Sequence, residues 1–368
     1  MLKFIHSLRS CKFSMDYSKE LEDLVTTVIR EDASDLHLSV GRYPSLRVQG
    51  ALIPLTQKQI LTPDVVRGLV LAMLTKDQQD EFLKSKEYDF SFDHKGRARF
   101  RCNIFFQRGF VGCAMRLVPV KIRTVEELNL PESIKEFTRK EQGFFLCVGP
   151  TGHGKTTTLA ALIDLINHER AEHILTIEDP IEYLFEADRS IIDQREVRSD
   201  TTDFHVALRS MFRQDINVAM IGEMRDFETI SAAVTAAETG HLIFSSLHTN
   251  NAAQSIDRII DSFPGSQQSQ IRAQLANTLV GLFSQRLIPR ISGGLVPAFE
   301  LMIANQAIKN LIRENRVHEL DLVIDTSSQE GMISLNRSLK ELLQKGEITM
   351  EDAIAYSLNP SELRMIAR

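Results

Sequence analysis

The chain has 368 residues, of which 43% are hydrophobic and 25% charged, as expected for a globular protein with two or three domains. The formal net charge of −6 argues against a general nucleic-acid binder, because a phosphate backbone demands a basic protein surface. No apolar run approaches the roughly 18 residues that a membrane-spanning helix needs. Residues 1–15 lack the apolar core of a secretion signal, and we expect them to form a flexible extension.

The cysteines include no C-x-x-C pair, so the sequence does not indicate a zinc ribbon. They stand at Cys11, Cys102, Cys113 and Cys147. Three of them have apolar neighbours, which predicts buried free thiols. Free thiols fit the reducing environment of the cytoplasm.

Apolar spacing in the first part of the chain predicts a compact α+β domain over residues 16–117. The pattern indicates helices at 17–31, 63–74 and 76–84, and strands at 35–40, 45–52, 97–104 and 111–117. In the strand at 97–104, Arg97, Arg99 and Arg101 alternate with apolar residues, so a period of two puts the arginines on one face. The returning strand presents Arg116. This face is either a solvated basic surface or a site for an anion.

Residues 118–135 contain two prolines and several charges, which predicts a linker. From residue 143 onward, short β-rich apolar runs alternate with helical patterns, which favours a mainly parallel sheet covered on both faces. We expect strands at 144–148, 174–177, 218–221 and 242–246, and a mostly helical last third. Residues 136–368 are therefore assigned to a second, α/β domain.

A complete phosphate-binding loop lies between the first of these strands and a helical pattern. It fits G-x-x-x-x-G-K-S/T at every fixed position, and Thr157 follows it. Backbone N–H groups of such a loop bind phosphate, the lysine reaches the β- and γ-phosphates, and the hydroxyl of the last residue binds Mg²⁺. The residues are Gly149, Pro150, Thr151, Gly152, His153, Gly154, Lys155, Thr156 and Thr157.

Three later segments indicate how a nucleotide could be used. The acidic residues Glu178, Asp179 and Glu182 follow the strand at 174–177, where ligands bind in open α/β sheets. An acidic loop at this position can also simply cap the next element. The strand at 218–221 ends in Gly222-Glu223, and Glu223 is the first acid available to handle Mg²⁺. His241 and His248 bracket the strand at 242–246, where a structural role and a phosphate contact are equally reasonable.

Together these segments strongly resemble the type IV pilus and type II secretion ATPases, over about residues 16–368. The phosphate loop, the acidic segment 176–182, the Gly222-Glu223 pair and the histidine segment 236–249 occur in the family's order. They also carry its characteristic spellings, such as Ala236-Ala237-Glu238-Thr239-Gly240-His241. Two features favour the retraction type: the family's four-cysteine zinc site is absent, and residues 307–314 are close to the signature AIRNLIRE.

The resemblance implies a PAS-like N-terminal α+β domain followed by a RecA-like P-loop ATPase domain with a helical C-terminal portion. It implies ATP and Mg²⁺ as ligands and a homohexamer that holds ATP between subunits. The implied partner is an inner-membrane pilus platform protein, contacted at the cytoplasmic face of the inner membrane. No nucleic-acid partner is implied.

The resemblance also assigns roles to individual residues. Glu182 is expected to activate the attacking water, and Glu223 is expected to be the Walker B carboxylate. Mg²⁺ would be held by Thr156, Glu223 and Glu178, partly through water. His241 and His248 would sense the γ-phosphate or couple it to domain movement. Arginines of the N-terminal domain would reach the nucleotide: Arg99, Arg101 and Arg116.

Some positions depart from the family pattern and leave alternatives open. His153 stands where the family commonly has Ser, and Ile216 and Asn217 replace the Pro and second Asp of a usual Asp-Pro-Asp. Residues 317–320 also resemble the accessory paralogue of the retraction motor. The alternatives are an accessory or regulatory ring acting with a paralogous motor, and a zinc-less extension or secretion ATPase. The net charge counts against a third, a RecA-like nucleic-acid motor.

Overall fold

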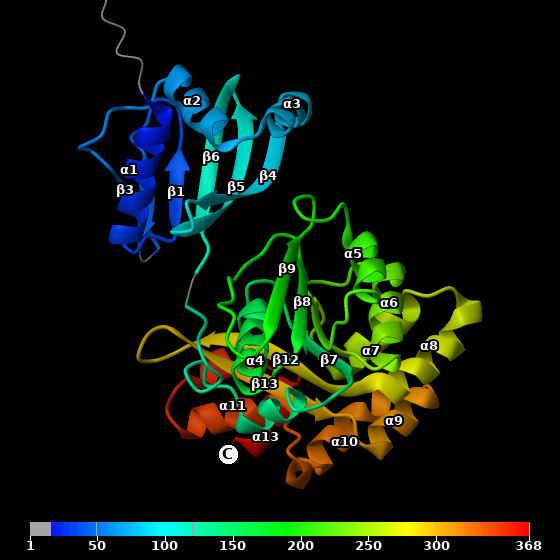
Figure 1. Cartoon of the computed structure of the whole chain (residues 1–368). Helices are drawn as coiled ribbons and strands as arrows, with labels where there is room; N and C mark the ends of the chain where they lie inside the picture. The colour runs from blue at the N-terminus through cyan, green and yellow to red at the C-terminus, as the bar shows by residue number, and fades with distance from the viewer. Residues whose placement is uncertain (1–15, 49, 120, 368) are drawn as a thin grey trace, which may run out of the picture. The chain divides into compact units, whose positions relative to one another are not determined.

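The computed structural model describes residues 16–48, 50–119 and 121–367. The expected flexible extension at 1–15 lies outside them. The chain divides into two compact units with the boundary after Pro119, inside the segment expected to be a linker. Each unit is described by itself (Figure 1).

The first unit is an antiparallel sheet with helices, in the strand order β3-β2-β1-β6-β5-β4. Side-chain N-caps stabilise the starts of its helices. The Asp16 carboxylate accepts from the backbone N–H groups of Ser18 and Lys19 at the start of α1, and Thr75 and Gln78 form a capping box at α3. The elements are α1 Tyr17–Arg30, β1 Asp35–Leu38, β2 Ser45–Val48, β3 Ala51–Pro54, α2 Pro63–Met73, α3 Lys76–Ser85, β4 Glu87–His94, β5 Ala98–Gln107 and β6 Phe110–Leu117.

The sequence pattern was correct for most of these elements, but it did not predict β4 and was wrong at two further points. The single strand expected at 45–52 is the hairpin β2–β3, in which Val48 pairs with Ala51 and Gly50 has a φ of +85°. Arg97 lies in the turn before β5, so it does not share the strand face with Arg99 and Arg101. The alternation itself is confirmed, because Phe100, Cys102 and Ile104 are buried on the opposite face of β5.

The second unit is built on a sheet in the order β13-β12-β7-β11-β10-β8-β9, in which only the β12–β13 pair is antiparallel. Its strands are β7 Gly143–Val148, β8 His173–Glu178, β9 Ile191–Glu196, β10 Val218–Ile221, β11 Leu242–Leu247, β12 Leu279–Pro289 and β13 Leu295–Ile303. The four central strands were expected from their apolar runs. The long β12–β13 hairpin was not, because the last third of the chain was expected to be mostly helical.

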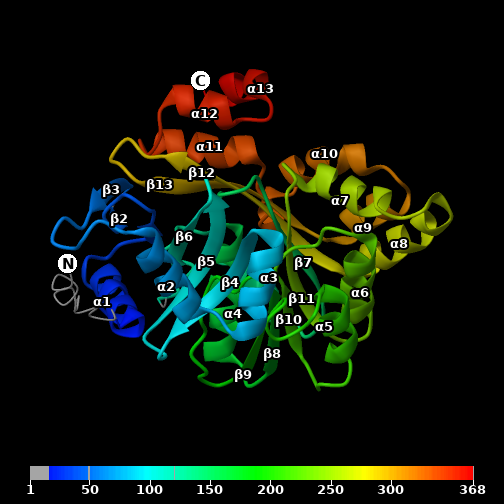
Figure 2. The ribbon, with the colours of Figure 1, turned by 90° about the horizontal axis from the view of Figure 1, so that it is seen from above.

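Helices cover both faces of this sheet, as the alternation of strands and helices predicted (Figures 1 and 2). Phe144, Leu146 and Val148 of β7 face one layer, whereas Phe145 and Cys147 face the other. The first layer is α5 Phe204–Met211, α6 Phe227–Glu238, α7 Ala252–Asp261, α8 Gly265–Thr278, α9 Gln306–Arg313 and α10 Leu320–Thr326; the second is the 3-10 helix Glu132–Phe137 and α4 Lys155–Glu169.

A third group of helices packs on the β12–β13 hairpin. Ile288, Val296 and Ala298 of the hairpin share a core with α11 Leu335–Gln344, α12 Met350–Tyr356 and α13 Pro360–Ile366. Figure 2 shows these helices beside β12 and β13.

Within the described residues, no helix is both long enough and apolar enough to span a bilayer. The thiols of Cys102, Cys113 and Cys147 are free and buried, as expected, and Cys11 lies outside the described residues. Burial raises the pKa of Cys113 and of Cys147 to about 12, so neither thiol is ionised at neutral pH.

Candidate functional site

The parallel register brings four sequence segments to one edge of the second sheet. Val148 of β7 pairs with Leu247 of β11, and Ile221 of β10 pairs with Ile177 of β8. Glu178 ends β8, and the phosphate loop, Gly222-Glu223 and His248 follow the ends of β7, β10 and β11. The carboxyl edge of a parallel sheet is where α/β proteins bind ligands.

Glycines shape the phosphate loop because the backbone is left-handed or tightly packed there. Gly149 has a φ of +146°, and a Cβ at this position would lie 2.3 Å from the carbonyl oxygen of Gln285. Gly154 has a φ of +83° and is the N-cap of α4. The loop therefore lies against β12 and leads its N–H groups into the start of a helix, which is the arrangement that binds phosphate.

Lys155 is buried at the centre of this loop. Its Nζ donates to the carbonyl oxygens of Gly149, at 2.9 Å, and of Pro150, at 3.0 Å. Burial lowers the pKa of Lys155, while the charges of Glu223 and Glu182 act in the opposite direction. Both carboxylates therefore lie within electrostatic reach of the lysine that the sequence assigned to the phosphates.

A chain of polar contacts connects the phosphate loop to the end of β10. His248 Nδ1 lies 3.2 Å from Lys155 Nζ and 3.1 Å from Thr151 Oγ1, and its Nε2 lies 3.2 Å from Glu223 Oε1. Glu223 Oε2 accepts from Arg225 Nε at 3.0 Å and from its second terminal nitrogen at 2.9 Å. The structure thus brings together four residues that the sequence singled out, Thr151, Lys155, Glu223 and His248, and adds Arg225.

Glu178 occupies a more enclosed position than the other acids. Its carboxylate accepts from Thr176 Oγ1 at 2.7 Å and from the Glu182 backbone N–H at 3.3 Å. Burial raises the pKa of Glu178 to about 7. These contacts suit a residue that positions the segment carrying Glu182 better than one that ligates a metal directly.

The neighbouring segment also contacts the start of α4. Thr157 Oγ1 lies 2.8 Å from the Tyr183 hydroxyl, one residue beyond the half-buried Glu182. Asp179 is exposed and lies 3.9 Å from Arg198. Glu182 is thereby held beside the phosphate loop, whereas the exposed Asp179 lies within electrostatic reach of Arg225.

His241 is not brought to the phosphate loop of its own chain. It precedes β11 and His248 follows it, so about six strand residues, or roughly 20 Å, separate the two histidines. The His241 Nδ1 atom lies 3.0 Å from the carbonyl oxygen of Ala236, at the end of α6. The role assigned to His241 stays a prediction.

In the first unit, the expected arginine face is carried by adjacent strands. Arg101 pairs across strands with Arg116, and Arg99 lies two residues earlier on the same face of β5. Arg116 Nε donates to Asp35 Oδ1 at 2.8 Å, so this arginine has a partner within its own unit. Contact of these arginines with a nucleotide stays a prediction.

The departure at Ile216 and Asn217 lies away from the phosphate loop. Both precede β10, at the opposite edge of the sheet from Glu223. Ile216 is buried in the core, and Asn217 Oδ1 accepts from the His173 backbone N–H at 2.8 Å. Ile216 therefore packs in the core, and Asn217 caps the edge of the sheet opposite Glu223.

Sequence reasoning missed the polar residues that distant segments supply. Gln285 of β12 contacts the phosphate loop, and in the sequence it is only the middle of a short polar stretch between apolar residues. A cavity of about 480 Å³ beside His248 was also not foreseen. Its lining includes Arg225, His248, Gln254, Asp257 and Arg258.

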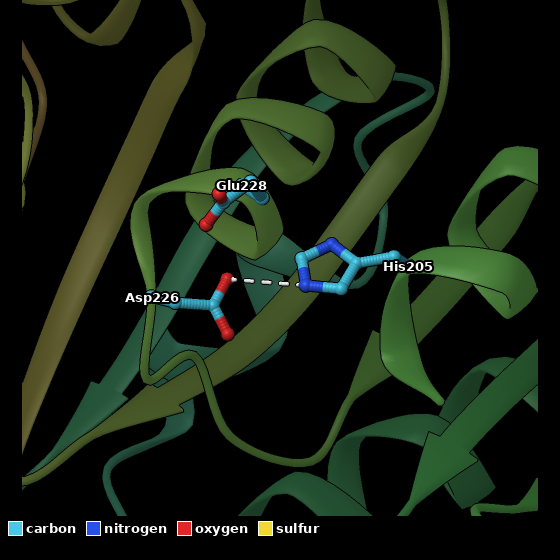
Figure 3. Close-up of side chains that lie close together, drawn as sticks. All are labelled: His205, Asp226 and Glu228. Carbon is cyan, nitrogen blue, oxygen red and sulfur yellow. Dashed lines mark ion pairs between the residues drawn. The ribbon is translucent and has the colours of Figure 1, made fainter. Parts of the chain in front are cut away.

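A surface cluster near the site consists of His205, Asp226 and Glu228, whose ligand atoms lie within 4.8 Å of one another (Figure 3). His205 Nε2 lies 3.7 Å from Asp226 Oδ1, and the two side chains are 37% and 47% exposed. Asp226 Oδ1 also accepts the capping bond from the Thr229 N–H at 2.8 Å. A helix cap and an ion pair account for this cluster.

The site and sheet define a P-loop ATPase. The family model described as Type II/IV secretion system protein matches residues 16–319. The chain is 44% identical over 339 residues to the type IV pilus retraction ATPase PilT of Pseudomonas aeruginosa, covering 91% of this chain and 97% of that protein. It is 39% identical over 350 residues to the type IV pilus ATPase PilU of the same organism, covering 95% and 91%.

A crystal structure of the pilus retraction motor PilT with bound ADP superimposes with a TM-score of 0.88 at 42% identity, covering 94% of this chain and 98% of that one. The chain therefore belongs to the family of type II/IV secretion system proteins, and it is an ATPase. The expected fold class is confirmed: a PAS-like α+β domain precedes a RecA-like ATPase domain with a helical C-terminal portion.

Proposed function

We propose that this chain is the subunit of a homohexameric, Mg²⁺-dependent motor that hydrolyses ATP to retract type IV pili. The observation that carries the proposal is the chain of contacts from Lys155 through His248 to Glu223 at the phosphate loop. The similarity to PilT, over 97% of that protein, supports the pilus system as the place where the ATPase acts.

The donor set at the loop fits Mg²⁺. The Thr156 hydroxyl at the start of α4 and the Glu223 carboxylate at the end of β10 are oxygen ligands, which Mg²⁺ prefers. When bound, Mg²⁺ supplies positive charge that offsets charge developing on the transferred phosphate. Glu178 is buried and already hydrogen-bonded, so we assign it to orienting the Glu182 segment.

The residues of the chain then divide the work. The loop N–H groups and Lys155 bind and orient the phosphates, and Glu182 accepts a proton from the attacking water. His248 lies between Lys155 and Glu223, so it is placed to register whether a γ-phosphate occupies the loop. When the arginine face contacts the nucleotide in the ring, Arg99 and Arg101 stabilise the negative charge that develops on the phosphate in the transition state.

We assign His241 a separate role, which is to couple the state of the γ-phosphate to domain movement. It lies at the end of α6, at the edge of the sheet away from the loop. A contact there can transmit a change in the ring without touching the nucleotide of its own chain. The ring would work at the cytoplasmic face of the inner membrane, against the pilus platform protein.

A second candidate function is that of an accessory ring that acts with a paralogous motor. The 39% identity to PilU over 95% of this chain favours considering it. The departures at Ile216 and Asn217 do not favour it, because they lie away from Glu223.

Deletion of the gene in its host, followed by complementation, tests the proposal. Loss of a retraction motor should leave excess surface pili and abolish twitching, and a gene that encodes Glu223→Gln should not restore motility. Loss of pili would instead indicate an extension motor. Restoration of motility by the Glu223→Gln gene would favour the accessory ring.

A further inference from the structure

Strand β12 extends past the end of its neighbour and leaves an open edge beside the phosphate loop. The last pair between β12 and β7 joins Ser284 to Val148, whereas β12 continues with β13 as far as Pro289. The phosphate loop begins at that point, with the Gly149 backbone against the backbone of Gln285. The loop therefore takes the place of a neighbouring strand along residues 285–287.

Gln285 connects the loop and α4 through both ends of its amide. Its side chain is buried, and Oε1 accepts from Thr158 Oγ1 at 2.6 Å while Nε2 donates to the His153 carbonyl oxygen at 2.9 Å. A Cβ at Gly154 would lie 2.9 Å from Gln285 Nε2. The amide can make these bonds only while the loop keeps its present path.

His153 makes a second connection to the same strand. Its ring Nδ1 accepts a hydrogen bond from the Leu287 backbone N–H at 2.9 Å. A backbone N–H is always a donor, so Nδ1 carries no proton and the ring is neutral with its proton on Nε2. Without this acceptor, the Leu287 N–H would lose its partner at the open edge of β12, which is unfavourable for a partly buried group.

The surroundings of His153 favour the neutral ring. Partial burial lowers the pKa of His153, and the positive charges of Arg286 on β12 and Lys155 on α4 lower it further. Tyr356 of α12 also lies beside His153, and its ring meets the imidazole edge-on at 6.3 Å between centroids. Protonation would place a hydrogen on Nδ1 opposite the Leu287 N–H and break the contact.

We propose that Gln285 and His153 are positioning residues that clamp the phosphate loop to β12, and that protonation of His153 loosens the loop and weakens nucleotide binding. The inference deepens the proposed function at the same site, but it concerns nucleotide affinity and does not require turnover. A loop that spends less time in the binding conformation has an apparent Kd raised by the inverse of that fraction.

Nucleotide binding to the full-length protein with Mg²⁺ tests the His153 contact. A fluorescent ATP analogue is titrated between pH 5.5 and pH 8 into wild type, His153→Asn and His153→Ala. Asn keeps an acceptor for the Leu287 N–H and does not titrate, whereas Ala removes the acceptor. Titration of the analogue itself affects all three proteins equally at each pH.

The clamp predicts that the wild-type Kd rises about fivefold relative to His153→Asn at the acid end, which corresponds to about 1 kcal/mol. His153→Ala should bind about fivefold more weakly than His153→Asn at every pH. Tighter wild-type binding at acid pH would overturn the proposal, because it would show that the charged ring simply attracts phosphate. Equal binding by His153→Ala and His153→Asn would overturn it as well.

Gln285 is tested with a variant that keeps half of its contacts. Gln285→Glu retains an acceptor for Thr158 but has no donor for the His153 carbonyl. The control is Gln274→Ala on α8, which removes the 2.8 Å hydrogen bond from Gln274 to Glu238. We expect the Kd of Gln285→Glu to rise about tenfold, since a buried donor is lost and a charge is gained. An unchanged Kd in a folded variant would contradict the clamp. If Gln285→Glu does not fold, the His153 variants decide the matter.

The two proposals fail in distinguishable ways. Normal nucleotide binding with the predicted pH dependence but no ATP turnover would contradict the proposed motor function and support the proposed clamp. ATP turnover by a wild-type protein whose nucleotide affinity relative to His153→Asn does not change with pH would do the opposite.

Discussion

His248 Nε2 lies 3.2 Å from Glu223 Oε1. The other ring nitrogen lies 3.2 Å from Lys155 Nζ, so one imidazole connects the Walker B carboxylate to the phosphate-binding lysine. This arrangement supports the proposed role of His248 in reporting phosphate occupancy to the end of β10. Arg225, which donates twice to Glu223, extends the connection toward the cavity beside α7.

Replacing His248 by Ala should lower kcat about 10- to 100-fold, because the group that orients Glu223 and Lys155 is lost. His241→Ala should leave ATP affinity unchanged, since His241 lies at the other end of β11. Steady-state ATPase kinetics with His318→Ala, an exposed histidine, as control check both. An unchanged kcat in His248→Ala, or a loss of ATP affinity in His241→Ala, would contradict these assignments.

Gly149→Ala should abolish nucleotide binding and lower the melting temperature. The added Cβ would lie 2.3 Å from the Gln285 carbonyl oxygen, and neither backbone can move without displacing the loop or β12. Gly265→Ala is the matched control, because a Cβ there meets nothing within 4 Å. Thermal unfolding with and without ATP measures both effects, and ATP stabilisation of Gly149→Ala equal to that of wild type would refute this reading.

The sequence predicted what depends on local pattern. The apolar runs at Val218–Ile221 and Leu242–Leu247 and the phosphate loop between strand and helix all appear where expected. Glu223 and His248 could be predicted to meet, because parallel strands end at one edge. The clamp could not, since Gln285 lies 132 residues from His153 and reaches it only because β12 is the neighbour of β7.

The placement of His241 shows a second limit. Two histidines that bracket one strand look equivalent in the sequence, yet the length of β11 sends them to opposite edges of the sheet. The β12–β13 hairpin was missed for a related reason. Its strands are long and mixed in polarity, so Ser284, Gln285 and Glu300 interrupt the apolar pattern that marks the central strands.

Glu300→Gln should change how stability depends on pH. Burial raises the pKa of Glu300 to about 7, above the 4.5 of an unperturbed glutamate. The folded state therefore holds its proton more tightly, and wild type loses stability as the pH rises from 4.5 to 7. The variant mimics the protonated acid and avoids a loss of about 3 kcal/mol at pH 8.

Melting temperatures at pH 5 and pH 8 check this prediction. The melting temperature of Glu300→Gln should exceed that of wild type at pH 8 and be similar to it at pH 5. The control is Glu351→Gln at an exposed position, and its melting temperature should change with pH as that of wild type does. A constant difference between Glu300→Gln and wild type across the range would show that Glu300 does not titrate as described.

Arg101→Ala should lower kcat at least about tenfold while leaving the melting temperature within a few degrees, if the arginine face supplies charge to the transition state. Arg116→Ala should instead destabilise the first unit, because it leaves the buried Asp35 carboxylate without its 2.8 Å partner. Exposed Arg42→Ala is the control for both. An Arg101→Ala protein with normal kcat would remove the arginine face from the mechanism.

The most direct test of the account is the steady-state ATPase rate of the purified protein, measured with Mg²⁺ and with chelator, beside Glu223→Gln. We predict Mg²⁺-dependent turnover in wild type and a fall of at least about 100-fold in the variant, which should still bind ATP. ATP binding without turnover in wild type, or undiminished turnover in Glu223→Gln, would contradict the assignment of this site as the place where the motor hydrolyses ATP.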